Sequence, residues 1–76
     1  MGTSDLERLL GKDTRAYRAY LLTHQDRIFR AEDILAASDY DAIRIARRLA
    51  DKHPVELWER DRLVHRIEPG SGEHRP

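Results

Sequence analysis

The sequence predicts a two-layer α+β domain, in which one helix covers one face of a four-stranded, mostly antiparallel sheet in the order β-β-α-β-β. Two observations lead to this fold class. Two pairs of short runs rich in aliphatic and aromatic residues flank one segment whose apolar residues recur at helical spacing. The chain has 76 residues and therefore forms one domain at most, and a single helix suffices to cover one face of such a sheet.

Residues 1–16 are predicted to be an accessory N-terminal segment. Ser4 and Glu7 fit a capping box, and "DLERLL" then predicts a short N-terminal helix of about two turns that ends at Gly11. A helix of this length is unstable alone in water. The segment therefore either docks through its apolar stripe or is disordered; the stripe consists of Leu6, Leu9 and Leu10.

The first hairpin is predicted from "AYRAYLLT" (residues 16–23) and "IFRAEDILA" (residues 28–36), joined by a turn at "HQDR". Asp26 suits this turn because its carboxylate can bond to the backbone ahead of it. The polar middle of the second strand predicts a bulge or an early end near Glu32. Alternation gives the first strand two faces, one with Tyr17, Ala19 and Leu21 and the other with Arg18, Tyr20 and Leu22.

The helix is predicted over "SDYDAIRIARRLADKH", residues 38–53. Ser38 is the expected N-cap, and Asp41 completes an acidic form of the capping box. Pro54 is expected to end the helix because its ring clashes with the preceding turn. Ile45 falls near the edge of the apolar stripe, whose small side chains would let the helix approach the sheet closely. The stripe consists of Ala42, Ile43, Ala46, Leu49 and Ala50.

The second hairpin is predicted within residues 55–68, around "RDR". A loop of two residues after Glu59 pairs Leu57 with Val64, whereas a loop of three residues pairs Leu57 with His65. The sequence leaves this register open. The strand order is open as well, and an antiparallel sheet with the first and third strands in the centre is favoured.

The small α+β domain is therefore predicted to span residues 17–68, and "GSGEHRP" within residues 69–76 predicts a flexible tail. Four motifs in this span, "YRAYLL", "AEDI", "DAIRIARRLAD" and "VELWERDRLVHRI", resemble a group of short uncharacterised proteobacterial proteins. The resemblance implies the β-β-α-β-β pattern and a bacterial origin. This chain departs from the group at both turns, where "HQDR" and "ERDR" contain no Gly. The motifs are structural, so the resemblance implies no activity.

The composition narrows the function classes. The absence of cysteine excludes disulfides, thiolate metal sites and thiol catalysis, and it fits a reducing cytoplasm. No apolar run approaches the roughly 20 residues of a membrane span, and the start "MGTSDLERLL" does not resemble a signal peptide. We therefore expect a cytoplasmic protein without a membrane partner.

No constellation of side chains predicts catalysis or metal binding. None of the four histidines forms a pair at i, i+3 or i+4, which is the helical spacing typical of zinc ligands. No Ser or Thr follows a nucleophile-elbow motif or lies beside an obvious base. The "GSG" near the C-terminus has no helix behind it to make a phosphate loop. We expect no enzyme activity, no metal and no cofactor.

One helix leaves the second sheet face uncovered. Tyr, Trp and Arg are enriched at interface hot spots, and an apolar sheet face on a small chain suits dimerisation. The predicted function is therefore a protein-interaction or self-associating module, with a second copy or another protein as its partner. Trp58 lies either in this surface or in the core, because Trp is buried on average. The predicted interaction surface consists of Arg18, Tyr20, Leu22, Trp58 and Arg60.

The alternative function is nucleic-acid binding. Aromatic side chains of the same face would stack on bases, or a basic helix patch would contact the phosphates. The balance of 14 basic and 14 acidic residues argues against this function, and Glu56 and Glu68 would repel phosphate. The helix patch consists of Arg44, Arg47, Arg48 and Lys52.

Overall fold

The computed structural model describes residues 14–70. Within these residues the chain forms β1 (Arg15–Leu22), β2 (Ile28–Ala36), α2 (Asp39–Leu49), β3 (Val55–Glu59) and β4 (Arg62–Ile67). All neighbouring strands are antiparallel and the sheet order is β2-β1-β3-β4. The α+β fold is confirmed, including the central position of the first and third strands. The predicted N-terminal helix and most of the predicted tail lie outside the described residues.

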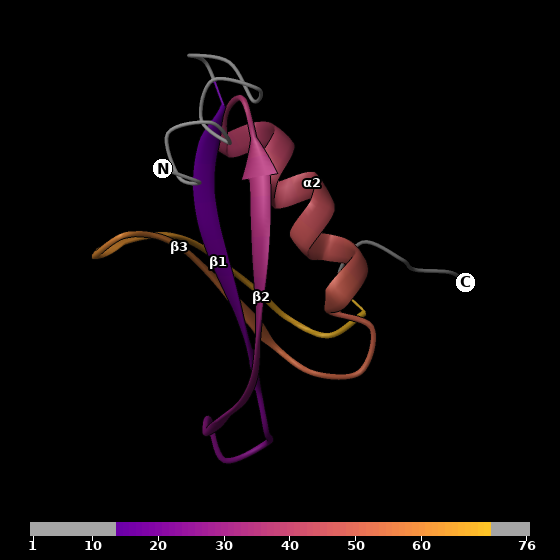
Figure 1. The fold of residues 1–76 in the computed structure, drawn as a ribbon. Coiled ribbons are helices and arrows are strands. Elements are labelled where there is room, and N and C mark those ends of the chain that lie inside the picture. Colours follow the sequence, from indigo (N-terminus) through magenta and orange to yellow (C-terminus); the bar gives the residue numbers. More distant parts are fainter. Residues whose placement is uncertain (1–13, 71–76) are drawn as a thin grey trace.

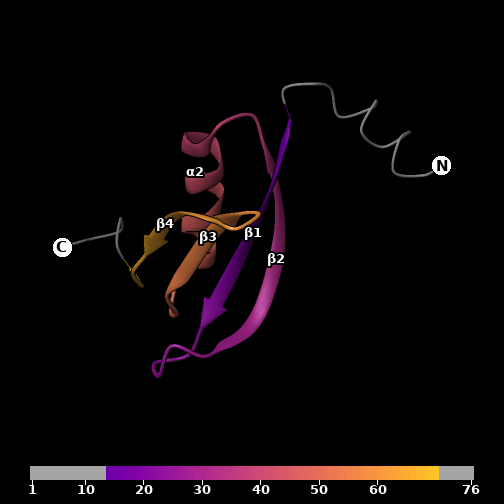
Figure 2. The ribbon, with the colours of Figure 1, turned by 90° about the vertical axis from the view of Figure 1, so that its left-hand side faces the viewer.

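The sheet has one covered face. Figure 1 shows α2 lying along one side of the sheet, and in Figure 2, turned by 90°, the strands lie side by side with α2 behind β3 and β4. The β3-β4 hairpin crosses the β1-β2 hairpin at a clear angle in Figure 1, so the sheet is strongly twisted. The described part of the chain contains no other helix to cover the second face.

The core fills the space between α2 and the sheet. The helix contributes Ala42, Ala46 and Ala50, whose small side chains allow the close approach that the sequence predicted. The sheet contributes larger side chains, and Val55 and Leu57 from β3 are the largest that are completely buried. The other buried strand residues that form this cluster are Tyr17, Ala19, Leu21, Ile34, Ala36 and Ile67.

The helix begins where the sequence predicted and ends earlier. Ser38 has extended backbone angles (φ −152°, ψ 165°), and its Oγ accepts a 3.1 Å hydrogen bond from the N–H of Asp41. The helix ends at Leu49 and not at residue 53. The chain turns away at Ala50, whose N–H donates to Arg47 and whose carbonyl accepts a 3.0 Å hydrogen bond from Gly70. The helix therefore ends before Pro54, at a point where the Ala50 carbonyl is hydrogen-bonded to Gly70.

The first hairpin differs from the prediction in two details. Asp26 does occupy the turn, with φ 64°, but its carboxylate does not cap the turn. The Oγ1 of Thr23 does so, because it accepts 3.2 Å hydrogen bonds from the backbone N–H groups of Gln25 and Arg27. β1 also begins at Arg15, inside the segment predicted to be accessory.

A bulge interrupts β2, although not near Glu32 as predicted. The register shifts where Leu22 pairs with Ile28 and Leu21 pairs with Arg30, so Phe29 is the extra residue. The strand runs through Glu32 without a break, and the carboxylate of Glu32, which is 35% exposed, forms an ion pair with Arg30 at 2.6 Å.

The second hairpin combines both predicted registers. The loop has two residues, and Arg60 adopts φ 57° there. Beyond the loop, however, Leu57 pairs with His65 as a loop of three residues would require. A bulge at Val64 reconciles the two, and it lets the Val64 side chain pack against the core.

Candidate functional site

The sheet face opposite α2 is left uncovered by the residues that the structure describes, and we call it the open face. The strand register determines which side chains share it. Arg18 of β1 lies between Asp33 of β2 and Trp58 of β3, and Leu63 of β4 lies beside Trp58. Neighbouring rows add further side chains by the alternation of each strand: Tyr20, Ile28, Leu35, Glu56 and Arg66.

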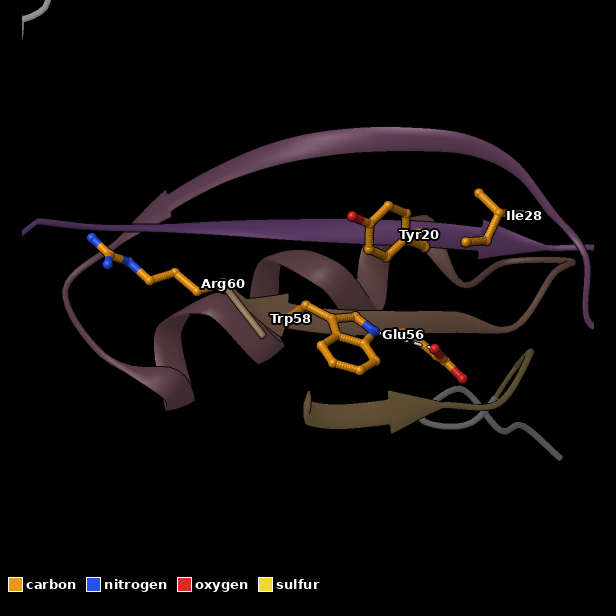
Figure 3. Close-up of a pocket in the computed structure, with 5 residues that line it drawn as sticks. All are labelled: Tyr20, Ile28, Glu56, Trp58 and Arg60. Carbon is orange, nitrogen blue, oxygen red and sulfur yellow. Dashed lines mark hydrogen bonds between the residues drawn. The ribbon is translucent and has the colours of Figure 1, made fainter. Parts of the chain in front are cut away.

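An apolar hollow of about 340 Å³ lies in the open face. Tyr20 and Trp58 come to it from the two central strands, and Ile28 comes from the edge strand (Figure 3). The Nε1 of Trp58 donates a 3.2 Å hydrogen bond to Glu56, which satisfies the indole N–H and fixes the ring. The hollow is therefore a preformed aromatic site in which the indole N–H is already paired.

Large apolar side chains surround the hollow and remain in contact with water. Ile28 is 58% exposed, and Leu35 and Leu63 are each 48% exposed. Removing apolar surface from water is favourable by roughly 25 cal/mol per Å². Three such side chains on one face, beside two half-buried aromatic rings, are more than the scattered apolar residues of an ordinary surface.

The charges on the open face are separated along the strands. At one end the guanidinium of Arg66 contacts the carboxylates of Glu68 at 2.8 Å, Asp26 at 3.0 Å and Glu56 at 3.2 Å. These hydrogen bonds, first Glu68 and then Asp26, raise the pKa of Arg66 above its ordinary value. Three carboxylates around one cation leave this acidic end with a negative charge.

The opposite end of the open face carries Arg60. Its side chain lines the hollow from the β3-β4 turn and extends away from Glu56 and Ile28 (Figure 3). No carboxylate among residues 14–70 forms an ion pair with it. Between the two ends, Arg18 and Asp33 neutralise each other at 3.1 Å. The open face is thus basic at one end, neutral in the middle and acidic at the other end.

The sequence-predicted interaction surface is largely brought together. Arg18, Tyr20 and Trp58 lie on the open face, and Trp58 is half-buried there and outside the core cluster. Leu22 lies on the same side of β1 as Tyr20, since it pairs with Ile28 and is not part of the core cluster. It is only 3% exposed, however, so it is covered and is not available for contact.

Sequence reasoning missed the exposed aliphatic part of the open face. The sequence placed Ile28, Leu35 and Leu63 on strands but did not show which face of the sheet each of them occupies, because the register of each hairpin was open. The only signal was their apolar character next to polar neighbours. Pairing across strands was needed to place them beside Trp58.

A second cluster, which we call the corner cluster, joins the start of α2 to both hairpins on the covered side. Asp39, the first residue of α2, accepts from the Tyr17 hydroxyl at 2.8 Å and from Arg62 at 2.9 Å. Glu59 accepts from Arg62 at 2.6 Å and from Arg15 at 2.9 Å. Every charged member has an oppositely charged partner, so the cluster acts as a clamp that holds the start of α2 to both hairpins.

The pKa values in the corner cluster follow from these contacts. Hydrogen bonds from Arg15 and Arg62 lower the pKa of Glu59 to about 2. Burial, and then the hydrogen bond to Asp39, raise the pKa of Tyr17 to about 12. Hydrogen bonds from Arg62 and Tyr17 lower the pKa of Asp39. No sequence pattern could identify this cluster, since its members are far apart in the chain.

The predicted basic helix patch lies on the outer side of α2 and just beyond its end. Its four residues are exposed. Arg44 is engaged locally, at 3.9 Å from Asp41 and above the ring of Tyr40. Within the described chain, Arg47, Arg48 and Lys52 form no ion pair.

The histidines are partly brought together by the fold. The rings of His24 and His53 lie 6.2 Å apart between centroids, and Phe29 contacts His53 edge-on at 4.8 Å. Over residues 14–70, no group of three or more His, Cys, Asp or Glu is arranged to hold a metal ion. Likewise, none of the helices described is long and apolar enough to cross a membrane.

The fold and the open face define a small α+β protein with one uncovered, aromatic sheet face. Comparison of the chain with protein-family models, with curated proteins and with solved structures found no match in any of the three. The resemblance to short proteobacterial proteins therefore stays a prediction.

Proposed function

We propose that the protein is a non-catalytic, cytoplasmic protein-interaction module that binds a polypeptide chain through its open face. The observation that carries this proposal is the hollow between Tyr20 and Trp58, with Ile28 exposed at its rim. Aromatic anchors beside Arg are typical of the residues that dominate binding energy at interfaces. The lack of cysteine supports the reducing compartment.

The edges of the sheet are less suited to binding than the open face. Edge strand β2 carries Arg30, Glu32 and Asp33 in its middle, and charged side chains on an edge oppose pairing with a further strand. The other edge strand, β4, is short and contains the bulge at Val64, which also disrupts pairing. Both edges are thus protected, while the open face is not.

A second candidate function, nucleic-acid binding, is supported by the exposed side chains of Arg47, Arg48 and Lys52 on the helix side. Their cationic groups would neutralise phosphates, so binding would weaken steeply with salt. The expected result for this candidate is binding to mixed-sequence RNA or DNA at low salt, with a salt slope that falls in R47E and R48E. Absence of binding at low salt would remove the candidate.

The primary proposal is tested by photo-crosslinking in living cells. The photo-reactive analogue p-benzoylphenylalanine is placed either at Tyr20, on the open face, or at Tyr40, which is 71% exposed on α2. The proposal predicts discrete protein adducts from the Tyr20 position and none from the matched Tyr40 position. Equal labelling from both positions, or none from Tyr20, would overturn it, and the mass of each adduct identifies the bound chain.

A further inference from the structure

We infer that the chain docked on the open face is a second copy of this protein, related to the first by a two-fold axis that runs across the strands. This inference rests on the proposed function and names its partner. Closed two-fold dimers are the commonest assemblies of soluble proteins. They require a surface that is complementary to itself, which the open face is in its charges.

Charge complementarity is the first argument. One end of the open face carries Arg60, and the other end carries the three carboxylates around Arg66. An axis along the strands would place like ends together, so that Arg60 would face Arg60 of the other copy. An axis across the strands reverses the strand ends, so that Arg60 of each copy faces the acidic end of the other.

The strand register fits this second arrangement. Trp58 lies midway between Glu56 on β3 and Arg60 at the start of the β3-β4 turn, with each of them two residues away. An axis that passes at Trp58 therefore brings Arg60 of each copy over Glu56 of the other. The row along this axis also holds Arg18 and Asp33, each of which faces its own counterpart in the other copy. Their ion pair within each copy leaves the row without net charge.

The exposed apolar side chains lie on both sides of the same row. On β2, Leu35 lies on the Arg60 side of Asp33, and Ile28 lies on the acidic side. The axis across the strands places Leu35 of one copy over the half of β2 that holds Ile28 in the other. Two sheets stacked in this way pack about 10 Å apart with their strands nearly aligned, which would cover the hollow.

The area of the open face is sufficient for a weak but specific dimer. Four strands at a spacing of about 4.8 Å make the sheet roughly 19 Å wide, and six residues at about 3.3 Å each make it roughly 20 Å long. The flat footprint is then roughly 400 Å² per copy, and side-chain relief raises the total buried area to the order of 1,000 Å². Such an area lies at the lower end for specific interfaces, and we expect micromolar affinity.

The experiment is sedimentation equilibrium of the full chain from about 1 μM to about 1 mM, at low and high salt. We expect a monomer–dimer equilibrium that R60E and E68R each weaken at least about tenfold, because R60E makes both ends of the face acidic and E68R cancels the negative charge of the acidic end. An equimolar mixture of R60E and E68R should regain dimers, since the glutamate introduced at position 60 then faces the arginine introduced at position 68, and Arg60 of the second copy still faces an unchanged acidic end. Circular dichroism verifies that both variants are folded.

The matched control is R47E, which makes the same charge reversal on the outer side of α2 and should leave the dimer unchanged. If the folded wild-type protein stays monomeric at every concentration, the inference that the partner is a second copy is wrong. The proposed function is then still tested independently, by the protein adducts formed from the Tyr20 position. A dimer that is weakened by R47E and not by R60E overturns both the dimer through the open face and the proposed function of that face, because it places the interface on the helix. Two weakened variants whose mixture stays monomeric overturn the head-to-tail arrangement.

Discussion

The hydroxyl of Tyr17 donates a 2.8 Å hydrogen bond to the carboxylate of Asp39. Tyr17 belongs to the central strand β1 and is only 3% exposed, whereas Asp39 is the first residue of α2. The contact therefore joins the two layers at the point where the helix begins. The negative charge of Asp39 also lies at the positive end of the helix dipole.

Replacing Tyr17 by Phe removes this hydrogen bond and leaves the ring in the core. We expect Y17F to lower the free energy of unfolding by about 1 kcal/mol, because Asp39 keeps its contacts with Arg15 and Arg62 and is not left unsatisfied. Urea denaturation measures the change. Y40F, at an exposed position on α2, is the matched control and should have no effect; equal effects from both variants would contradict the clamp.

Acid should destabilise the protein through Glu59. Its pKa falls from an ordinary value of 4.5 to about 2 in the fold. The folded state therefore favours the charged form, and this contribution is complete above about pH 4.5 and is lost as the pH falls through about 2. Thermal unfolding between pH 6 and pH 2 measures it, and E59Q should show a shallower loss over the same range. If E59Q loses as much thermal stability as the wild type between pH 6 and pH 2, other carboxylates cause the loss.

The cap at Ser38 should stabilise the helix by a measurable amount. S38A removes the Oγ that accepts from the N–H of Asp41, and we expect a loss of about 1 kcal/mol. S38D keeps an acceptor at this position and should recover most of the stability. The measurement is chemical denaturation followed by far-ultraviolet circular dichroism, and equal losses in both variants would show that Ser38 does not act as the cap.

Two leucines on opposite faces of the second hairpin provide a matched test of the covered and open faces. Leu57 is completely buried, and L57A should cost about 2–5 kcal/mol because it opens a cavity in the core. A loss of that size would unfold much of a domain this small. L63A makes the same chemical change at a side chain that is 48% exposed, and it should cost far less in the monomer. Comparable losses would mean that Leu63 is covered within a single chain.

The faces of β1 were predicted correctly from the sequence, but the burial of each side chain was not. Tyr17, Ala19 and Leu21 were predicted to share a face by alternation, and all three are buried. The next residue, Leu22, lies on the other side of β1 as alternation predicts, where it pairs with Ile28 outside the core cluster, and yet it is only 3% exposed. Alternation gives the side of the strand on which a residue lies, but it does not show which side chains the neighbouring strands will cover.

The candidate site was predictable only in part, because residue type can be read from the sequence and strand neighbours cannot. Residue type pointed to Arg18, Tyr20 and Trp58, because these types recur at interfaces. It could not point to Ile28, Leu35 or Leu63, whose role depends on which strand lies beside each of them. Nor could it reveal that Arg66 collects carboxylates from the first turn, from β3 and from the end of β4.

The sequence by itself determined the features that depend on neighbours along the chain: the cap at Ser38, the alanine stripe of α2 and the presence of two hairpins around one helix. These features follow from backbone propensity and periodicity, which act over a few residues. The tertiary structure alone decided the bulge at Val64 and the contact between Arg15 and Glu59, which are 44 residues apart. Such features arise only when both hairpins pack on α2 together, because the register that buries most apolar surface is a property of the whole sheet.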